Sequence, residues 1–191
     1  MYSEKMQSIL NDLENKEIEI AGGSVVGMVL STTNSLIKYI ANMTIGKKNY
    51  EEVQDKVKEI LNSAEELKLK SMQTIDKDKE ILEEILETYK IKKQNEEKYQ
   101  FICKKATDFS LGVVYIANDT LKLSNEIAKV GNRMLSSDFK ICKYYAIASI
   151  QSAMENVYIN LKGITDEDYK KDIESKCRKI LEDERNFIWK F

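Results

Sequence analysis

The complete absence of proline is the feature that most limits what this chain can fold into. Only seven of its 191 residues are glycine, so the two residue types that most often break helices are almost missing. The rest of the chain is rich in glutamate, lysine, leucine and isoleucine, a composition that suits helices. The sequence therefore predicts an all-α protein, a bundle of long antiparallel helices in a single domain that spans residues 1–191.

A repeating pattern marks one long helix, which we expect from Glu51 to about Tyr89. Apolar and small residues recur there in alternating steps of four and three, as on a face that packs against other helices. This face comprises Val53, Val57, Ile60, Ala64, Leu67, Ser71, Thr74, Asp78, Ile81 and Ile85.

Asp78 is the one carboxylate on that inward face. A buried and unpaired carboxylate costs several kcal/mol or becomes protonated, so Asp78 needs a partner or a chemical role. The alternative is that the helix kinks or ends there and water solvates the side chain. Asp76 lies about 200° away around the helix and belongs to its wet side.

The spacing of apolar residues predicts five further helices, over about 3–15, 24–43, 99–131, 139–161 and 166–189. The helix over 139–161 has two inward faces, one of which consists of small and amide residues. Asn156 and Asn160 lie one turn apart on that face. Because buried amides must be hydrogen-bonded, they bind either neighbouring backbone or the amide and carbonyl groups of a ligand.

Two glycines open the most apolar of these helices. Gly22 and Gly23 precede Ser24, whose hydroxyl suits a helix N-cap, and a helix start offers free N–H groups and a positive dipole end to an anion. We expect this start to face a polar group, although a plain turn and cap would give the same sequence. Small residues recur along the helix at intervals of four, which lets another backbone approach closely. These residues are Gly27, Ser31 and Ser35.

Composition excludes several classes of protein. The chain has no histidine, which rules out histidine-dependent triads and histidine-ligated zinc and leaves acid–base chemistry to Asp, Glu, Lys or Tyr. Three widely spaced cysteines form no CxxC pair, so we expect reduced thiols in the cytoplasm rather than a metal site or disulfides. A formal net charge of −2 argues against nucleic-acid binding. We also expect neither a signal sequence nor a membrane span.

Five segments, in order, carry a resemblance to a known family. They are Ala21 to Ser24, Ala41 to Glu51, Ile75 to Asp78 with its Asp-x-Asp, Gly131–Asn132 with Ser137–Asp138, and Asn156 to Leu161 with its Asn-Val-x-Ile-Asn-Leu run. With these segments in this order, the chain resembles the cyclodeaminase/cyclohydrolase family, and the resemblance extends over nearly its whole length. That family includes the C-terminal half of formiminotransferase-cyclodeaminase and stand-alone methenyltetrahydrofolate cyclohydrolases. Arg133 and Met134 stand where the family has Pro-Asn, and the usual family prolines are absent.

The resemblance implies a helical homodimer that acts on one-carbon derivatives of tetrahydrofolate. Family cyclohydrolases open 5,10-methenyltetrahydrofolate with water to give 10-formyltetrahydrofolate, which is the activity we expect. Family cyclodeaminases release ammonia from the 5-formimino derivative, which is the near alternative. The expected small molecule is thus a folate substrate, with no metal or nucleotide cofactor and with neither nucleic acid nor membrane as partner. A non-catalytic helical interaction module is the alternative of another class, because heptad seams suit it equally well.

Either reaction needs a group that moves protons at a carbon–nitrogen centre. Without histidine, a carboxylate whose pKa is raised by burial is the natural choice. The catalytic candidates are, in order, Asp78, Asp76 and Asp138. Lysines can pair with the glutamate carboxylate of a folate, while amides and backbone N–H groups can orient its pterin ring. The expected substrate-binding residues are Gly22, Gly23, Ser24, Lys47, Lys48, Tyr50, Asn132, Asn156 and Asn160.

Overall fold

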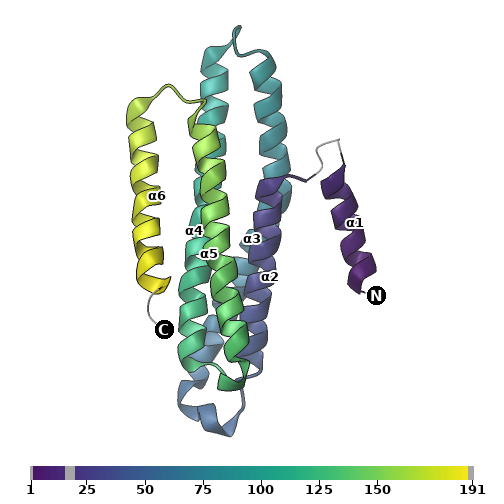
Figure 1. Cartoon of the computed structure of the whole chain (residues 1–191), viewed down its shortest axis with the longest axis vertical. Coiled ribbons are helices and arrows are strands. Elements are labelled where there is room, and N and C mark those ends of the chain that lie inside the picture. The colour runs from purple at the N-terminus through teal and green to yellow at the C-terminus, as the bar shows by residue number, and fades with distance from the viewer. Residues whose placement is uncertain (1, 16–19, 189–191) are drawn as a thin grey trace.

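The computed structural model describes residues 2–15 and 20–188, and this part of the chain forms helices and turns without any strand (Figure 1). The α-helices are α1 (Tyr2–Glu14), α2 (Gly22–Asn42), α3 (Gln54–Lys90), α4 (Glu96–Val130), α5 (Ser136–Leu161) and α6 (Glu167–Ile188). Two short 3₁₀ helices, η1 (Lys48–Val53) and η2 (Arg133–Leu135), precede α3 and α5. The predicted all-α bundle is confirmed.

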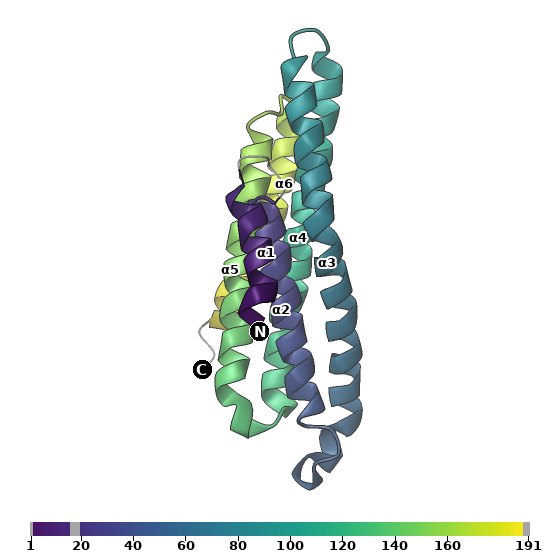
Figure 2. The same cartoon turned by 90° about the vertical axis from the view of Figure 1, so that its right-hand side faces the viewer.

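Four helices build the core. α2 packs against α3 and α5, and α4 packs against α3 and α5, so the four helices form a closed bundle (Figures 1 and 2). α6 covers the outside of α4 and α5. Fully buried aliphatic side chains fill the interior in two clusters, one of which includes Leu121 and Val157 and the other Ile37, Ile60 and Ile127.

α2 is much shorter than α3 and α4, and this difference decides where the start of α2 lies in the bundle. α2 has 21 residues, whereas α3 has 37 and α4 has 35. α3 and α4 therefore continue as a hairpin beyond the first turn of α2, where α2 no longer fills the space between α3 and α5 (Figure 1). The start of α2 thus lies inside the bundle's length rather than at its end.

The long helix predicted from Glu51 is correct over most of its length but wrong in its first turns. Residues 48–53 form η1 instead, and Tyr50 has a non-helical backbone (φ −129°, ψ 20°). The α2 helix starts two residues earlier than predicted, with Ala21 at the N-cap and no side-chain cap bond, so Ser24 is not the cap. Ser24 is instead in the first turn of α2, where its hydroxyl faces α3.

Close approach of α2 to α3 depends on glycine at one predicted position. A Cβ atom on Gly27 would lie 2.9 Å from the Ser71 carbonyl oxygen of α3, which no real contact tolerates. The rest of the predicted small-residue stripe does not share this role, because Ser31 is half-buried and Ser35 is exposed. Their hydroxyls donate to the carbonyl oxygen four residues earlier in α2 itself.

Among the described residues, no helix combines the length and the apolarity needed to cross a bilayer.

Candidate active site

Asp78 and Ser24 form the polar contact between α3 and the first turn of α2. Asp78 Oδ2 accepts a hydrogen bond from the Ser24 backbone N–H at 2.8 Å and lies 3.1 Å from the Ser24 hydroxyl. The same hydroxyl lies 2.9 Å from the Ile75 carbonyl oxygen. Asp78 is half-buried in the middle of α3, so the alternative of a solvated carboxylate at a kink or helix end is wrong.

The environment of Asp78 acts on its proton affinity in two directions. Burial raises the pKa of the Asp78 carboxyl group, because the charged form loses hydration. The Ser24 backbone N–H and hydroxyl work against this by stabilising the carboxylate, but burial dominates and the pKa stays above its ordinary value. Among the described residues no hydrogen bond reaches Oδ1. One oxygen is therefore held by Ser24 and the other is available to a ligand.

The absence of a side chain at Gly23, in the first turn of α2, leaves room for the Asp78 carboxyl group. A Cβ atom on Gly23 would overlap the Asp78 carboxyl group, whereas one on Gly22 would meet nothing within 4 Å. Gly23 therefore lets Asp78 reach the first turn of α2. The N–H groups of that turn have no helical partner, so Gly22 and Gly23 can donate to a ligand oxygen.

A hollow of about 130 Å³ adjoins Asp78. Residues from the start of α2 and from α3, α4 and α5 line it, and most of the lining is apolar. The lining residues are Ala21, Gly22, Gly23, Asp78, Ile81, Leu82, Ile85, Phe109, Ser110, Asn156, Ile159 and Asn160. Six predicted site residues thus come together. Five of them line the hollow, namely Gly22, Gly23, Asp78, Asn156 and Asn160, and the sixth, Ser24, binds Asp78.

The two asparagines of this hollow differ in their bonding. Asn160 Nδ2 donates to the Ser110 hydroxyl at 3.3 Å. Asn156 is half-buried, and its amide has no hydrogen-bond partner among the described residues. An amide that is both partly enclosed and unpaired is suited to bind a polar group of a ligand.

The sequence alone does not predict the α4 side of the hollow. Phe109 and Ser110 lie in the segment of α4 where the family resemblance leads one to expect a proline. On α5, Ile159 lies inside a segment that matches the family, but nothing in the sequence marks it as a site residue. The one available signal is helical register, because Ile159 and Asn160 share a face of α5 with Asn156.

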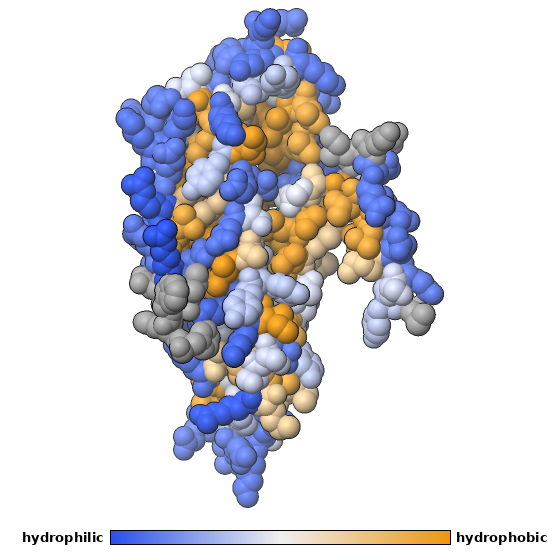
Figure 3. All heavy atoms as spheres, viewed as in Figure 1, coloured by the Kyte–Doolittle hydropathy of each residue, from blue (hydrophilic) through white to orange (hydrophobic). Residues whose placement is uncertain are grey.

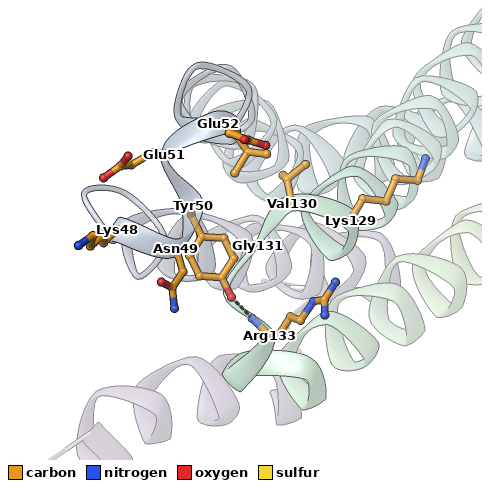
Figure 4. Close-up of a pocket in the computed structure, with 10 residues that line it drawn as sticks. Lys48, Asn49, Tyr50, Glu51, Glu52, Lys129, Val130, Gly131 and Arg133 are labelled. Carbon is orange, nitrogen blue, oxygen red and sulfur yellow. Dashed lines mark hydrogen bonds between the residues drawn. The ribbon is translucent and has the colours of Figure 1, made fainter.

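The remaining predicted binding residues lie at the other end of α2. Lys47, Lys48, Tyr50 and Asn132 line a second hollow of about 430 Å³ together with Met134. A third hollow of about 560 Å³ beside it includes Lys48, Tyr50 and Arg133, with Lys129 on its far side (Figure 4). The Tyr50 hydroxyl accepts a hydrogen bond from the Arg133 backbone N–H at 2.9 Å.

At this end of α2, Asn132 links the segment that follows α2 to the segment between α4 and α5 through hydrogen bonds. Its backbone N–H donates to the Thr44 hydroxyl at 2.9 Å, and its side-chain Nδ2 donates to the Met43 carbonyl oxygen at 3.3 Å. Its Oδ1 accepts from the Met134 N–H at 3.2 Å. Asn132 is only 4% exposed, so its amide holds the fold and is not free for a substrate.

The predicted site residues thus form two groups at opposite ends of one helix. α2 has 21 residues, which corresponds to roughly 30 Å. Asp138 is half-buried in the first turn of α5, at the Tyr50 end, and is remote from Asp78. Asp76 is exposed on the solvent side of α3, as its position around the helix predicts. Within one chain, only Asp78 of the three candidate carboxylates faces the first hollow.

Comparison with known proteins adds a family and several relatives. The family model described as formiminotransferase-cyclodeaminase matches residues 5–179. A methenyltetrahydrofolate cyclohydrolase from Methylorubrum extorquens is 29% identical over 171 residues, which cover 86% of this chain and 82% of that protein. A formimidoyltransferase-cyclodeaminase from Gallus gallus is 24% identical over 169 residues, which make up 85% of this chain but 31% of that longer protein.

A solved structure has the same fold. The crystal structure of a formiminotetrahydrofolate cyclodeaminase from Thermotoga maritima superposes with a TM-score of 0.86 and 28% sequence identity. The superposition covers 91% of this chain and 86% of that chain. The helical architecture described above is therefore shared over nearly its full length.

Proposed function

The chain belongs to the formiminotransferase-cyclodeaminase family, and from that membership we propose that it hydrolyses 5,10-methenyltetrahydrofolate to 10-formyltetrahydrofolate. The similarity to a cyclohydrolase over 82% of that protein's length supports this activity. The site supports it through one observation. Asp78, of which one carboxylate oxygen accepts no hydrogen bond from the described residues, lines a partly apolar hollow beside the start of α2 and beside Asn156, whose amide has no partner among those residues.

In this proposal Asp78 moves the protons of the reaction. As a carboxylate it takes a proton from water while the water oxygen bonds to the methenyl carbon, which gives a neutral carbinolamine. The protonated Asp78 then donates to N5 as the bond from N5 to that carbon breaks, and the carbinol hydroxyl loses its proton to form the formyl group on N10. One water is consumed and one proton is released. A raised pKa suits both steps, because the group must accept a proton and give it back.

The surrounding groups position the substrate rather than react. The Asn156 amide and the N–H groups of Gly22 and Gly23 provide donors and an acceptor for the polar edge of a pterin ring. The apolar walls formed by Ile81, Ile85 and other aliphatic residues keep bulk water away, which strengthens every polar contact in the hollow. Binding here would therefore orient the methenyl carbon toward Asp78 Oδ1.

A formiminotetrahydrofolate cyclodeaminase, a lyase, is the second candidate. The observation that favours it is the structural match to the Thermotoga maritima enzyme of that name. The same Asp78 would then protonate the departing ammonia. Two assays run side by side separate the candidates: loss of methenyltetrahydrofolate absorbance reports the hydrolase, and ammonia release from the 5-formimino compound reports the lyase. Turnover in neither assay, with no rise in melting temperature on adding tetrahydrofolate, would favour the non-catalytic helical module.

The proposal extends to assembly and compartment. A homodimer is what the family resemblance implies. Cys103, Cys142 and Cys177 are all free and buried, and such thiols suit a protein that works in the reducing cytoplasm.

A further inference from the structure

Ser110 is the one serine or threonine of α4 whose side chain does not bind its own helix. Thr107, Thr120 and Ser124 each donate to the carbonyl oxygen four residues earlier, at 2.8, 2.9 and 2.7 Å. This is the usual arrangement of such a residue inside a helix. The Ser110 hydroxyl instead accepts a hydrogen bond from Asn160 Nδ2 of α5 at 3.3 Å, its one bond among the described residues. Within this part of the chain, the Ser110 hydroxyl proton therefore has no acceptor.

This incomplete bonding lies in the candidate active site. Ser110 is only 7% exposed, and it lines the same hollow as Asp78. A buried hydroxyl group that donates to no acceptor has given up its bond to water without a replacement, which costs free energy. An acceptor on a ligand in the hollow would supply the missing bond.

Asn160 brings a free acceptor next to this free donor. Its Nδ2 is engaged with Ser110, while its Oδ1 accepts no hydrogen bond from the described residues. Asn160 also lines the hollow. Because a hydrogen bond joins the two side chains, the Ser110 hydroxyl proton and Asn160 Oδ1 lie close together. They form a donor and an acceptor for one ligand, which we call the Ser110–Asn160 pair.

The hollow has room for one ring system rather than for a whole folate. Its volume of about 130 Å³ is below the ~300–1,000 Å³ of pockets that enclose drug-sized ligands. Apolar residues line most of it, and in Figure 3 orange residues gather between α5 and α3, beyond the first turn of α2. Phe109 adds an aromatic ring beside Ser110. Asp78 is the only charged residue of the lining, so an anionic glutamate tail would meet a carboxylate there and no cation.

On the basis of the proposed function, we propose that the Ser110–Asn160 pair binds the amide edge of the pterin ring, which makes Ser110 a further substrate-binding residue. A pterin carries its N3–H donor and its C4 carbonyl acceptor on neighbouring ring atoms. Asn160 Oδ1 accepts from N3–H, and the Ser110 hydroxyl donates to the C4 carbonyl oxygen. Two bonds side by side fix the orientation of the ring as well as its position. The adjacent 2-amino group then remains for the unpaired Asn156 amide.

Two buried serines of α4 provide a matched test of this role. Ser110→Ala removes the free donor, so the affinity for tetrahydrofolate should fall by ~3–10-fold. Ser124→Ala is the control, because Ser124 is buried on the same helix but its hydroxyl is bound to the Thr120 carbonyl oxygen. Its affinity should equal that of the wild type. Isothermal titration calorimetry measures all three proteins, and a wild-type affinity in Ser110→Ala would overturn the role.

Two fragments of folate separate a direct contact from an effect on the fold. 6-Methyltetrahydropterin contains the ring system, and p-aminobenzoylglutamate contains the tail. In NMR titrations, Ser110→Ala should weaken the binding of 6-methyltetrahydropterin by the same ~3–10-fold and leave that of p-aminobenzoylglutamate unchanged. An equal loss for both fragments would mean that Ser110 acts through the fold. A loss for the tail fragment alone would place the tail in the hollow, and either result would contradict the proposal.

A double variant tests whether the two side chains act as a unit. Asn160→Ala removes the acceptor and also the Nδ2 group that bonds to the Ser110 hydroxyl. Ser110→Ala/Asn160→Ala should therefore bind tetrahydrofolate about as weakly as Asn160→Ala alone, because residues in one hydrogen-bond network are not additive. Losses that multiply in the double variant would show that the two residues do not form a pair.

The outcomes also distinguish this role from the proposed function. A wild-type protein that does not bind tetrahydrofolate would reject the folate function and the role of Ser110 together. Wild-type binding that Ser110→Ala leaves unchanged would reject only the role of Ser110. None of these measurements requires turnover, so their results do not depend on whether Asp78 moves the protons of the reaction.

Discussion

The Asp78 carboxyl group of α3 occupies the space that a side chain at position 23 of α2 would fill. This relationship lets a carboxylate from the middle of one helix reach the N-terminal turn of another, where the Ser24 N–H binds one of its oxygens. Asp78 and Asn156 both line the hollow at this place. The backbone N–H and the hydroxyl of Ser24 thus hold a reactive carboxylate in place, and the following predictions depend on that arrangement.

Replacing Asp78 should abolish turnover without unfolding the protein. Asp78→Asn keeps the size of the side chain but cannot exchange protons, so kcat should fall by at least ~100-fold. Asp55→Asn is the matched control, because Asp55 lies on the same helix with a side chain that is 98% exposed. Its turnover should equal that of the wild type. Circular dichroism on both variants checks the fold, and a small effect of Asp78→Asn would remove its catalytic role.

The two glycines should respond in opposite ways to alanine. Gly23→Ala forces the new Cβ into the Asp78 carboxyl group, so the free energy of unfolding should fall by ~1–3 kcal/mol. Gly22→Ala meets open space and gains the helix preference of alanine, so it should stabilise the protein by up to ~1 kcal/mol. Urea denaturation measures both. The double variant Gly23→Ala/Asp78→Ala should recover most of the lost stability, and a failure to do so would point to a different clash.

The Ser24 hydroxyl should set the acid limb of the pH profile. Burial raises the pKa of Asp78, and the Ser24 hydroxyl partly opposes that shift. Ser24→Ala should therefore raise the pKa further and move the acid limb of kcat against pH to higher pH. A limb that stays in place would mean that another group controls it.

The free energy of unfolding should also depend on pH through the raised pKa of Asp78. Because the folded-state pKa of Asp78 lies above its unfolded value, the carboxyl group favours the folded state at low pH. That contribution is lost as pH rises through the folded-state pKa. Asp78→Asn lacks this titration, so its unfolding free energy relative to wild type should increase over that pH range and then level off. Denaturation at several pH values measures it, and a constant difference would contradict the raised pKa.

Asn132 should prove structural rather than substrate-binding. Asn132→Ala removes the bonds to the Met43 carbonyl and the Met134 N–H inside a buried site, so the unfolding free energy should fall by ~1–3 kcal/mol. Met134→Asn, which restores the family residue at a side chain that is 87% exposed, should change stability by less than ~0.5 kcal/mol. Thermal unfolding compares the two. A stable Asn132→Ala variant with a raised KM would instead place Asn132 against the substrate.

Sequence periodicity determined much of the fold by itself. The lack of proline and the repeating inward faces predicted long helices, because side-chain direction follows from the 3.6-residue period. The same period placed Asp78 on the inward face of α3 and Asp76 on its wet side, and the structure confirms both positions. The helix starts were misplaced: α3 begins after η1 and so later than predicted, whereas α2 begins two residues earlier and α4 and α5 begin three residues earlier than predicted.

Only the tertiary structure decided which polar groups meet. The 3.6-residue period of the sequence predicts which side of its own helix a side chain lies on. It does not predict which helix packs against that side, or how far two helices are shifted along each other. The offset of α2 along α3 pairs Ser24 with Asp78 and leaves Lys47 and Tyr50 roughly 30 Å away. That offset comes from packing between residues distant in sequence, such as Gly27 against Ser71, so no local pattern could contain it.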